Sequence, residues 1–316
     1  MKIVVLDGYT CNPGDTSWQK LQELGELTVY DRTSEDLLLE RAKDAEILVT
    51  NKTPIGKETI DACEKLQMIA VLATGYNVVD TAYAHEKGIA VANVPAYGTE
   101  IVAQYAIALL LEITSQVGLH AQSVKAGEWS SSRDFAYWKT PLIELNGKTA
   151  GIIGLGRIGK ATARICRALG MKVLAVSPHE DEEGKKLAEY VSLPELLKES
   201  DVIFLHCPLK EDNKGLINKD TIAKMKDGVI LINNARGPLI VAEDLAAALN
   251  SGKVYAAGLD VAEQEPIAED DPLLRARNCY ITPHISWAAR EARQRIIDMT
   301  AENIAAFQRG EDLHRV

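Results

Sequence analysis

The chain has 316 residues, more than a single hydrophobic core usually supports, so we expect two domains. Hydrophobic residues make up 47% of it and charged residues 25%, which excludes a disordered or collagen-like chain. The formal net charge of −10 argues against a nucleic-acid-binding protein, which needs a basic face. It does not exclude small anionic substrates, because a few local cations can reverse the field inside a pocket.

We expect a cytoplasmic protein without a membrane span. The longest apolar stretch, 101–113, is interrupted by Gln104 and is shorter than the roughly 18–20 residues of a transmembrane helix. The N-terminal apolar run meets Asp7 too early for a signal peptide. The five cysteines are odd in number and widely spaced, which favours reduced thiols and no metal site.

Short β-branched runs alternate with amphipathic stretches from the N-terminus onward. This alternation predicts a parallel sheet with helices on both faces. The predicted strands are 3–7, 27–31, 46–51 and 68–73, and the predicted helices lie near 16–24, 34–43, 56–65 and 80–87.

The alternation then stops at a segment with an apolar stripe. Apolar residues at helical spacing predict one long helix over 98–126. The loop that follows, about 127–146, carries the aromatic residues Trp129, Phe135, Tyr137 and Trp138. An apolar stripe with exposed aromatic residues is typical of a subunit interface. The alternative is that both segments cover the domains of a single subunit.

A second alternating series predicts another α/β unit. Its predicted strands are 149–154, 172–177, 202–207, 228–234, 254–260 and 279–282, and its predicted helices are 157–169, 193–199, 220–225, 242–251 and 287–309. We expect the long helix to connect the two units and the final helix to pack back on the first one. The predicted fold class is α/β, with two doubly wound parallel sheets.

The sequence GLGRIG at 154–159 follows an apolar strand and opens an amphipathic helix. In this context Gly154 permits a tight turn, Gly156 lets the backbone approach a pyrophosphate, and Gly159 allows close packing of helix on strand. With Arg157 and Ile158 between them, these glycines predict a dinucleotide site whose anion lies on the first amides of the helix. The alternative is a glycine-rich turn of another α/β protein, which the surrounding strand–loop–helix–strand pattern disfavours.

The choice between NAD and NADP stays open. Ser177 stands 18 residues after Gly159, where NAD-binding units commonly carry Asp or Glu for the ribose hydroxyl. The missing carboxylate favours NADP. The missing Arg favours NAD, and so does the acidic run that follows, which consists of Glu180, Asp181, Glu182 and Glu183.

Three of the later predicted strands are followed by unusual polar residues: Arg236, Glu265 and His284. Ligands of open parallel sheets bind beyond the carboxyl ends of the strands, so these side chains are predicted to converge beside the nicotinamide. Each alone has an ordinary explanation as a surface charge, a turn residue or a structural histidine. The ordered set downstream of a dinucleotide loop is more specific.

Taken together, the motifs resemble those of the D-isomer-specific 2-hydroxyacid dehydrogenases, in particular the glycerate dehydrogenase (hydroxypyruvate reductase) type. The resemblance covers nearly the whole chain and rests on NKTPI (51–55), ATGYNVVD (73–80), NVPAYGT (93–99), GLGRIG (154–159), HCPL (206–209), NNARG (233–237), LDV–EPI (259–267) and TPHIS (282–286). It implies a flavodoxin-like catalytic domain made of 1–97 and 288–316. A Rossmann coenzyme domain, 98–287, is then inserted into that catalytic domain.

The resemblance also implies roles for individual residues. Arg236 binds the substrate carboxylate and polarises the 2-oxo group, for which its planar fork is well suited. His284 acts as general acid in reduction and as base in oxidation. Glu265 orients the imidazole and stabilises its protonated form.

Further residues are assigned to the substrate and to the coenzyme by the same resemblance. Asp260 is expected to anchor the nicotinamide amide. The remaining substrate-side residues are Lys52, Thr74, Gly75 and Tyr76, and the remaining coenzyme-side residues are Cys207, Pro208, Asn213 and Ala235.

The resemblance favours hydroxypyruvate and D-glycerate as the substrate pair, with glyoxylate as a second substrate, and it supports a homodimer. A D-lactate-type or other 2-oxo acid reductase is the nearest alternative. A dinucleotide-sensing corepressor-like scaffold is the alternative from another class. We expect an enzyme, because such scaffolds usually carry partner-binding tails and the sequence ends at Val316, shortly after its last predicted helix.

Overall fold

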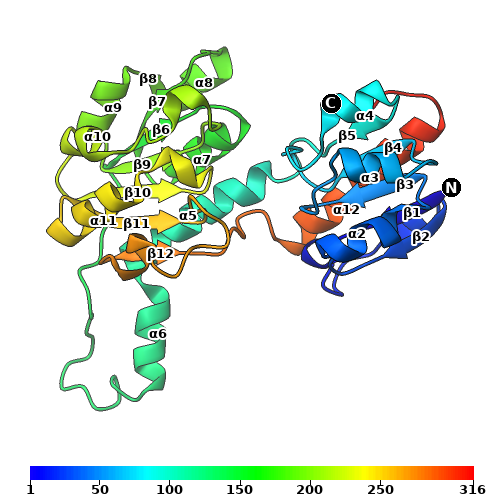
Figure 1. The fold of residues 1–316 in the computed structure, drawn as a ribbon. Coiled ribbons are helices and arrows are strands. Elements are labelled where there is room, and N and C mark those ends of the chain that lie inside the picture. Colours follow the sequence, from blue (N-terminus) through cyan, green and yellow to red (C-terminus); the bar gives the residue numbers. More distant parts are fainter. The chain divides into compact units, whose positions relative to one another are not determined.

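The computed structural model describes residues 1–316, and its contacts divide the chain into two compact units. Unit 1 comprises Met1–Gly98 and Trp287–Val316, and unit 2 comprises Thr99–Ser286. The blue N-terminal and red C-terminal parts of the ribbon therefore both belong to unit 1 (Figure 1). Each unit contains one parallel sheet, of five strands in unit 1 and seven in unit 2, which confirms the predicted α/β class.

The sheet of unit 1 has the strand order β2-β1-β3-β4-β5. This is the flavodoxin-like order, in which the direction of winding reverses between β1 and β3. The strands are β1 (Lys2–Val5), β2 (Glu26–Val29), β3 (Ile47–Thr50), β4 (Met68–Val71) and β5 (Ala90–Ala92). The sequence patterns predicted the first four. They did not predict β5, which has only three residues.

Helices cover both faces of this sheet, and the last helix of the chain is one of them. The helices are α1 (Gln19–Gln22), α2 (Glu35–Ala42), α3 (Lys57–Ala62), α4 (Thr81–Glu86) and α12 (Arg290–Gln308). Ile296, Ile297 and Ile304 of α12 pack against Ile3 and Ile47 of the sheet. The core of unit 1 is thus built from both ends of the sequence.

The sheet of unit 2 has the order β12-β11-β10-β9-β6-β7-β8. Counted from β6, this is the Rossmann order with one further strand, and the winding reverses between β6 and β9. The strands are β6 (Thr149–Ile153), β7 (Lys172–Val176), β8 (Glu189–Tyr190), β9 (Val202–Leu205), β10 (Val229–Asn233), β11 (Val254–Leu259) and β12 (Cys279–Ile281). Both β8 and the helix before it, α8 (Glu182–Leu187), lie in a stretch for which no element was predicted.

The helices of unit 2 also lie on both faces of its sheet. Helices α5 (Thr99–Ser115) and α7 (Arg157–Ala168) contribute Leu110 and Cys166 to one core, together with Phe204 of β9. The opposite core contains Leu196 and Leu245. The other helices are α6 (Val117–Lys125), α9 (Leu193–Glu199), α10 (Lys219–Ala223) and α11 (Ala242–Ser251), and short 3-10 turns occupy Glu211–Asn213, Gly237–Leu239 and Pro272–Arg275.

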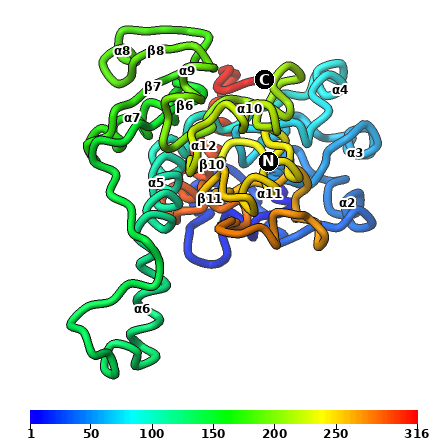
Figure 2. The backbone as a smooth tube through the Cα atoms, turned by 90° about the vertical axis from the view of Figure 1, so that its left-hand side faces the viewer, coloured from blue at the N-terminus to red at the C-terminus, as the bar shows by residue number.

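The prediction of one helix over 98–126 is wrong, because the chain breaks at Gln116. This residue has the left-handed φ of 47°, and α5 and α6 are bent by 55° relative to each other. The Gln116 side chain donates a hydrogen bond to the Tyr280 hydroxyl at 2.7 Å, which fixes the break. Beyond it, α6 and the following loop project from the body of unit 2 (Figure 2). No single helix is long and apolar enough to cross a membrane; α5 and α6 meet that criterion only as a bent pair.

Candidate active site

The residues predicted to bind the coenzyme and to react lie at one edge of the sheet of unit 2. The strands of this sheet run parallel, so their carboxyl ends share an edge. The glycine-rich loop follows β6, Ser177 follows β7, and Cys207 and Pro208 follow β9. Arg236 follows β10. Asp260 and Glu265 follow β11, and His284 follows β12. Ligands of doubly wound sheets bind at this edge, near the strands where the winding reverses.

The glycine-rich loop is packed so closely that two of its positions admit no side chain. Gly154 has a φ of 101°, and a Cβ there would lie 2.6 Å from the backbone nitrogen of Cys207. A Cβ on Gly159 would overlap the carbonyl oxygen of Gly154. A Cβ on Gly156 would meet no atom within 4 Å, so the chain leaves space on that side, where Arg157 begins α7. These features fit a dinucleotide whose pyrophosphate lies on the amides at the start of α7.

A partly buried histidine, His206, stabilises the loop after β9. A ring nitrogen of His206 forms a 2.9 Å hydrogen bond with the Thr162 hydroxyl of α7. Burial lowers the pKa of His206 to about 4, so the ring is neutral near pH 7. Further along, the Asn213 amide donates to the Pro208 carbonyl at 2.8 Å. His206 and Asn213 therefore stabilise the conformation of this loop, which lies beside the glycine-rich loop.

Arg236 lies on a short loop whose shape is set by Asn233, the last residue of β10. The Asn233 side chain donates to the carbonyl of Arg236 at 2.9 Å and accepts from the amide of Ala235 at 3.0 Å. The side chain of Arg236 is exposed and donates only to the Ala235 carbonyl, at 2.7 Å. Its guanidinium has no carboxylate partner in the protein and can therefore pair with an anionic ligand.

Glu265 and His284 are in direct contact. The Nδ1 atom of His284 lies 2.6 Å from Oε2 of Glu265, and Oε1 of Glu265 accepts from the amide of Ala262 at 3.1 Å. Both side chains are a little over one third exposed. His284 has a φ of 55°, a conformation that costs a non-glycine residue about 1–3 kcal/mol. The imidazole is thus oriented by a carboxylate and held on a strained backbone.

The surroundings of Asp260 assign it a positioning role. The residue is fully buried, and its carboxylate accepts hydrogen bonds from the Thr282 hydroxyl at 2.6 Å and from the amides of Ile285 and Ser286 at 2.9 and 2.6 Å. All three donors flank His284. The role expected for Asp260 toward the nicotinamide amide stays a prediction, whereas its contacts show that it holds the loop of the histidine.

The predicted substrate-side residues belong to unit 1. Lys52 follows β3, where the winding of that sheet reverses, and its side chain is exposed and makes no ion pair. The loop of Lys52 is held by Asp7, whose carboxylate accepts from the amides of Asn51, Lys52 and Thr53 at 2.7, 2.5 and 2.8 Å.

Thr74, Gly75 and Tyr76 follow β4 in unit 1. The Thr74 hydroxyl donates to the Val94 carbonyl at 2.8 Å, which anchors the start of this segment. The side chain of Tyr76 is 41% exposed. Its exposure leaves the aromatic ring available to a ligand.

Two positioning residues were not predicted from the sequence, Asp7 and Asn233. Asn233 ends a buried strand and binds backbone groups of the next few residues. Asp7 stands just after a buried strand and binds backbone amides of a neighbouring loop. A polar residue at such a place is the only signal that the sequence offers for them.

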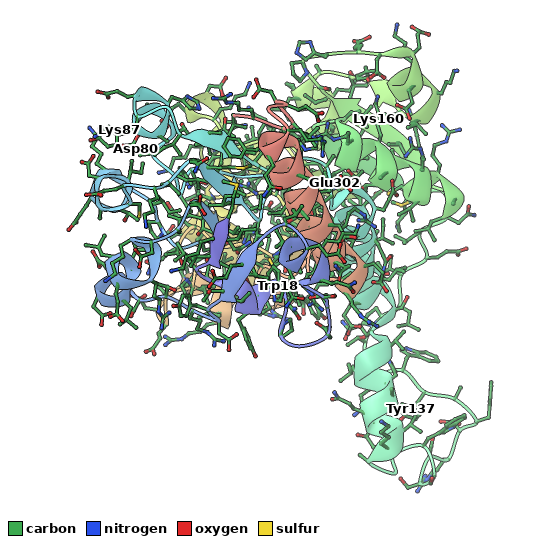
Figure 3. All side chains as sticks on the ribbon, turned by 90° about the vertical axis from the view of Figure 1, so that its right-hand side faces the viewer. Trp18, Asp80, Lys87, Tyr137, Lys160 and Glu302 are labelled. Atoms are coloured by element: carbon green, nitrogen blue, oxygen red, sulfur yellow. The ribbon has the colours of Figure 1, made fainter.

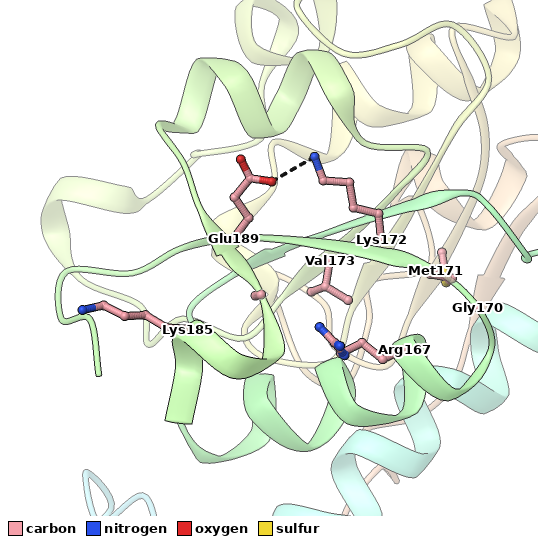
Figure 4. A pocket seen from close by; sticks show the side chains of 8 residues that line it. Arg167, Gly170, Met171, Lys172, Val173, Lys185 and Glu189 are labelled. Atoms are coloured by element: carbon pink, nitrogen blue, oxygen red, sulfur yellow. Dashed lines mark ion pairs between the residues drawn. The ribbon is translucent and has the colours of Figure 1, made fainter. Parts of the chain in front are cut away.

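A hollow of about 610 Å³ elsewhere in unit 2 does not belong to the site (Figure 4). It lies beside the C-terminal end of α7 and the first residues of β7, so it is at the amino end of that strand. Its most prominent polar contact is the ion pair between Lys172 and Glu189, at 2.9 Å. The predicted coenzyme position, Ser177, is at the other end of β7.

Comparison with known proteins identifies the family. Residues 107–286 match the model of the D-isomer specific 2-hydroxyacid dehydrogenase, NAD binding domain. The chain belongs to this family. It is 56% identical to a hydroxypyruvate reductase of Blautia hydrogenotrophica over 320 aligned positions, covering 100% of this chain and 99% of that protein.

Other dehydrogenases of the family are similar over their whole length. A glycerate dehydrogenase of Methylorubrum extorquens is 37% identical, with coverage of 98% of this chain and 96% of that protein. The structure of a D-lactate dehydrogenase from Escherichia coli superposes with a TM-score of 0.87 at 30% identity, covering 100% of both chains. The family and its two-sheet fold are thus shared by proteins that carry different substrate names.

The packing of the glycine-rich loop predicts different effects for two similar substitutions. Gly156→Ala adds a methyl group that meets no protein atom, so the unfolding midpoint should stay near that of the wild type while coenzyme affinity falls about tenfold or more. Gly154→Ala forces a strained φ and a clash with Cys207, so both quantities should fall. Coenzyme titration and thermal unfolding of the two variants measure the difference. Unchanged coenzyme binding by Gly156→Ala would contradict this placement of the pyrophosphate.

Proposed function

We propose that this enzyme reduces hydroxypyruvate to D-glycerate with a nicotinamide coenzyme, and that it takes glyoxylate as a second substrate. The observation that carries the proposal is the 2.6 Å contact between His284 and Glu265 at the same sheet edge as an unpaired Arg236. The choice of hydroxypyruvate is supported by the 56% identity with the Blautia hydroxypyruvate reductase. The similarity to the Methylorubrum glycerate dehydrogenase supports the same substrate pair.

In this mechanism Arg236 binds the substrate carboxylate. Its two-pronged guanidinium fixes both oxygens of the carboxylate in one plane and draws electron density from the adjacent 2-oxo group. The backbone amides of Thr74, Gly75 and Tyr76 and the cation of Lys52 are proposed as further substrate-binding groups. Unit 1 is then the catalytic domain and unit 2 the coenzyme domain.

His284 donates the proton. A reduced nicotinamide bound at this edge would supply the hydride for C2 of the substrate, and the imidazolium of His284 would donate the proton that the carbonyl oxygen needs. Glu265 keeps the ring in the orientation for this transfer and stabilises its positive charge before the proton leaves. In the direction of oxidation the neutral imidazole takes the hydroxyl proton back.

The coenzyme is proposed to lie along the edge formed by Gly154, Gly156, Arg157, Ile158 and Gly159. Its nicotinamide half would then extend past Cys207, Pro208 and Asn213 toward Ala235 and Asp260. All these residues follow the carboxyl ends of β6, β9, β10 and β11. The order of these strands in the sheet leads from the glycine-rich loop to His284.

A D-lactate-type reductase is the second candidate, supported by the similarity in fold and sequence to the Escherichia coli D-lactate dehydrogenase. The reacting group is the same 2-oxo acid in both cases. The difference lies in the hydroxyl of hydroxypyruvate, which a site built to bind it can distinguish from the methyl group of pyruvate.

We further propose that two copies of the chain associate through an arm formed by residues 117–142. Hydrogen bonds fix its shape: the Tyr137 and Ser123 hydroxyls lie 2.6 Å apart, and the Trp129 indole donates to the Phe135 carbonyl at 3.0 Å. Figure 3 shows Tyr137 in this projecting part of the chain. The phenyl group of Phe135 is 94% exposed and the indole of Trp138 is 69% exposed. A preformed surface of this kind suits a self-complementary dimer interface.

A cytoplasmic location is proposed on the chemistry of the thiols. All five cysteines are free, and burial raises the pKa of Cys11, Cys166 and Cys279 to about 12. Thiols of this kind suit a reducing compartment.

Steady-state assays with hydroxypyruvate, glyoxylate and pyruvate test the proposed substrate. We expect the highest kcat/KM for hydroxypyruvate in the wild type, and a loss of about a hundredfold or more for all three acids in Arg236→Lys, because a lysine cannot bind both carboxylate oxygens in one plane. Arg275→Lys is the matched control, because this exposed residue lies outside the reaction edge, the edge of the unit 2 sheet that carries Arg236, Glu265 and His284. A higher value for pyruvate supports the D-lactate candidate, and coenzyme binding without turnover on any acid supports a scaffold.

Removing the proton donor should separate catalysis from binding. His284→Asn keeps a polar side chain of similar size, so turnover should fall by about 10²–10⁴ while the Kd of the coenzyme changes little. His85→Asn, on an exposed face of α4, should behave as the wild type. Turnover of His284→Asn that matches the wild type would remove this histidine from the mechanism.

The arm can be tested by the mass of the particle in solution. Replacing Phe135 and Trp138 by Asp puts a carboxylate in place of each exposed ring, so the double variant should be a monomer if the wild type is a dimer. Leu274→Asp, at a residue that is 47% exposed outside the arm, should leave the mass unchanged. Light scattering coupled to size-exclusion chromatography gives the masses, and a wild-type monomer would refute the proposed dimer.

A further inference from the structure

The end of β7 is the place where the coenzyme's adenosine ribose is expected, if the proposed function holds. In Rossmann units a carboxylate here binds the 2′-hydroxyl of NAD, or a nearby Arg binds the 2′-phosphate of NADP. This chain has Ser177 at that position. The amide of Gly154 donates to the carbonyl of Val176 at 2.8 Å, so the segment that begins at Ser177 starts beside the glycine-rich loop.

Two cations of α7 face this segment, and both are already paired with carboxylates. The ammonium of Lys160 lies 2.5 Å from Oδ2 of Asp181 and 2.9 Å from Oε2 of Glu183. Arg164, one helical turn further on, pairs with Oε1 of Glu183. The side chain of Lys160 is only 13% exposed, because the two acids cover it. Figure 3 labels Lys160 on α7, in the same part of unit 2 as α8.

These ion pairs are fixed by the fold. Oδ1 of Asp181 accepts the amide of Gly184 at 2.7 Å and so caps the N-terminus of α8, while its other oxygen holds Lys160. The hydrogen bonds to Lys160 keep the pKa of Asp181 and of Glu183 below the usual range, and those acids raise the pKa of Lys160. All three groups are therefore charged near neutral pH.

Neither of the two α7 cations is left free to bind a phosphate. Lys160 and Arg164 are cancelled by Asp181 and Glu183, and Glu180 adds a negative charge without an ion pair. A 2′-phosphate carries about −1.5 to −2 charges near pH 7. Arg157 is unpaired, but it opens α7, where the pyrophosphate common to both coenzymes is expected.

We propose that Asp181 and Glu183 determine the coenzyme specificity of this enzyme. By neutralising Lys160 and Arg164 they exclude the 2′-phosphate of NADPH, and the Ser177 hydroxyl forms a hydrogen bond with the 2′-hydroxyl of NADH. The enzyme therefore uses NADH, although it lacks the carboxylate that usually selects this coenzyme. NADH is distinguished from NADPH mainly by the carboxylates that pair with the two cations, and in addition by the hydrogen bond between Ser177 and the ribose.

Binding of NADH and NADPH to the full chain, measured by fluorescence titration without substrate, tests the proposal. The wild type should bind NADH about tenfold or more tightly than NADPH. In Asp181→Asn/Glu183→Gln the released cations should raise NADPH affinity about tenfold or more, with NADH affinity within about threefold of the wild type. Asn at position 181 retains the cap of α8, and the gain for NADPH should shrink at high salt.

A matched control removes the same number of charges from the same segment. Glu180→Gln/Glu182→Gln leaves the partners of Lys160 and Arg164 in place. It frees only Lys185, an exposed cation of α8 that pairs with Glu182, so its affinity for NADPH should stay within about threefold of the wild type. Adding Lys160→Met to Asp181→Asn/Glu183→Gln should cancel most of the gain.

Each contrary outcome has a distinct meaning. An equal gain in the control variant would attribute the effect to net charge and overturn the proposal. Preference of the wild type for NADPH, or no gain in Asp181→Asn/Glu183→Gln, would overturn it while leaving the proposed function intact. A wild type that binds neither coenzyme refutes both.

Discussion

The geometry of the reaction edge depends on one buried carboxylate. Asp260 stands at the end of β11, its amide donates to the carbonyl of Asn233 on β10, and its side chain accepts three hydrogen bonds from the loop after β12. It thereby connects the loops of Arg236 and His284. Hydrogen bonds to a buried charged group are among the stronger ones, and loss of the acceptor would leave buried amides unpaired. The donors flank His284, whose left-handed φ costs about 1–3 kcal/mol.

The same arrangement occurs at the predicted substrate loop of unit 1. Asp7 follows the first strand, and its carboxylate gathers three successive backbone amides of the loop after β3. In each sheet, therefore, one loop that carries a proposed site residue, Lys52 in unit 1 and His284 in unit 2, is bound through its backbone to a carboxylate that follows the neighbouring strand. This division separates the residue that positions a loop from the residue that is proposed to bind or react.

The sequence was most informative where local pattern and packing agree. Strands such as 46–51 and 228–234 are continuous apolar runs because helices cover both faces of the sheets, and the observed strands β3 and β10 differ from them by one residue at each end. The helix over 98–126 was wrong because its apolar pattern continues through Gln116, whereas the break is fixed by Tyr280, far along the chain. Strand β8 has two residues, too few for a periodic signal. In the site, the contact of Glu265 with His284 fits the expectation from the motifs. The backbone partners of Asp7 and Asn233 could not be predicted, because nearly every residue carries a backbone amide and the sequence does not distinguish one from another.

The distribution of paired and unpaired cations explains how an acidic chain can accept anionic ligands selectively. The chain has a net charge of −10, yet the cations predicted to meet anions, Lys52, Arg157 and Arg236, make no ion pair. Lys160 directly follows the same glycine-rich sequence, Arg164 lies one helical turn further on, and both are paired. An unpaired guanidinium gains its full interaction from an incoming carboxylate, whereas a paired one must first give up the partner it holds. In the proposed assignments, pairing of the cations therefore decides which phosphate or carboxylate of a ligand is bound and which is excluded, without any change in the number of cations present.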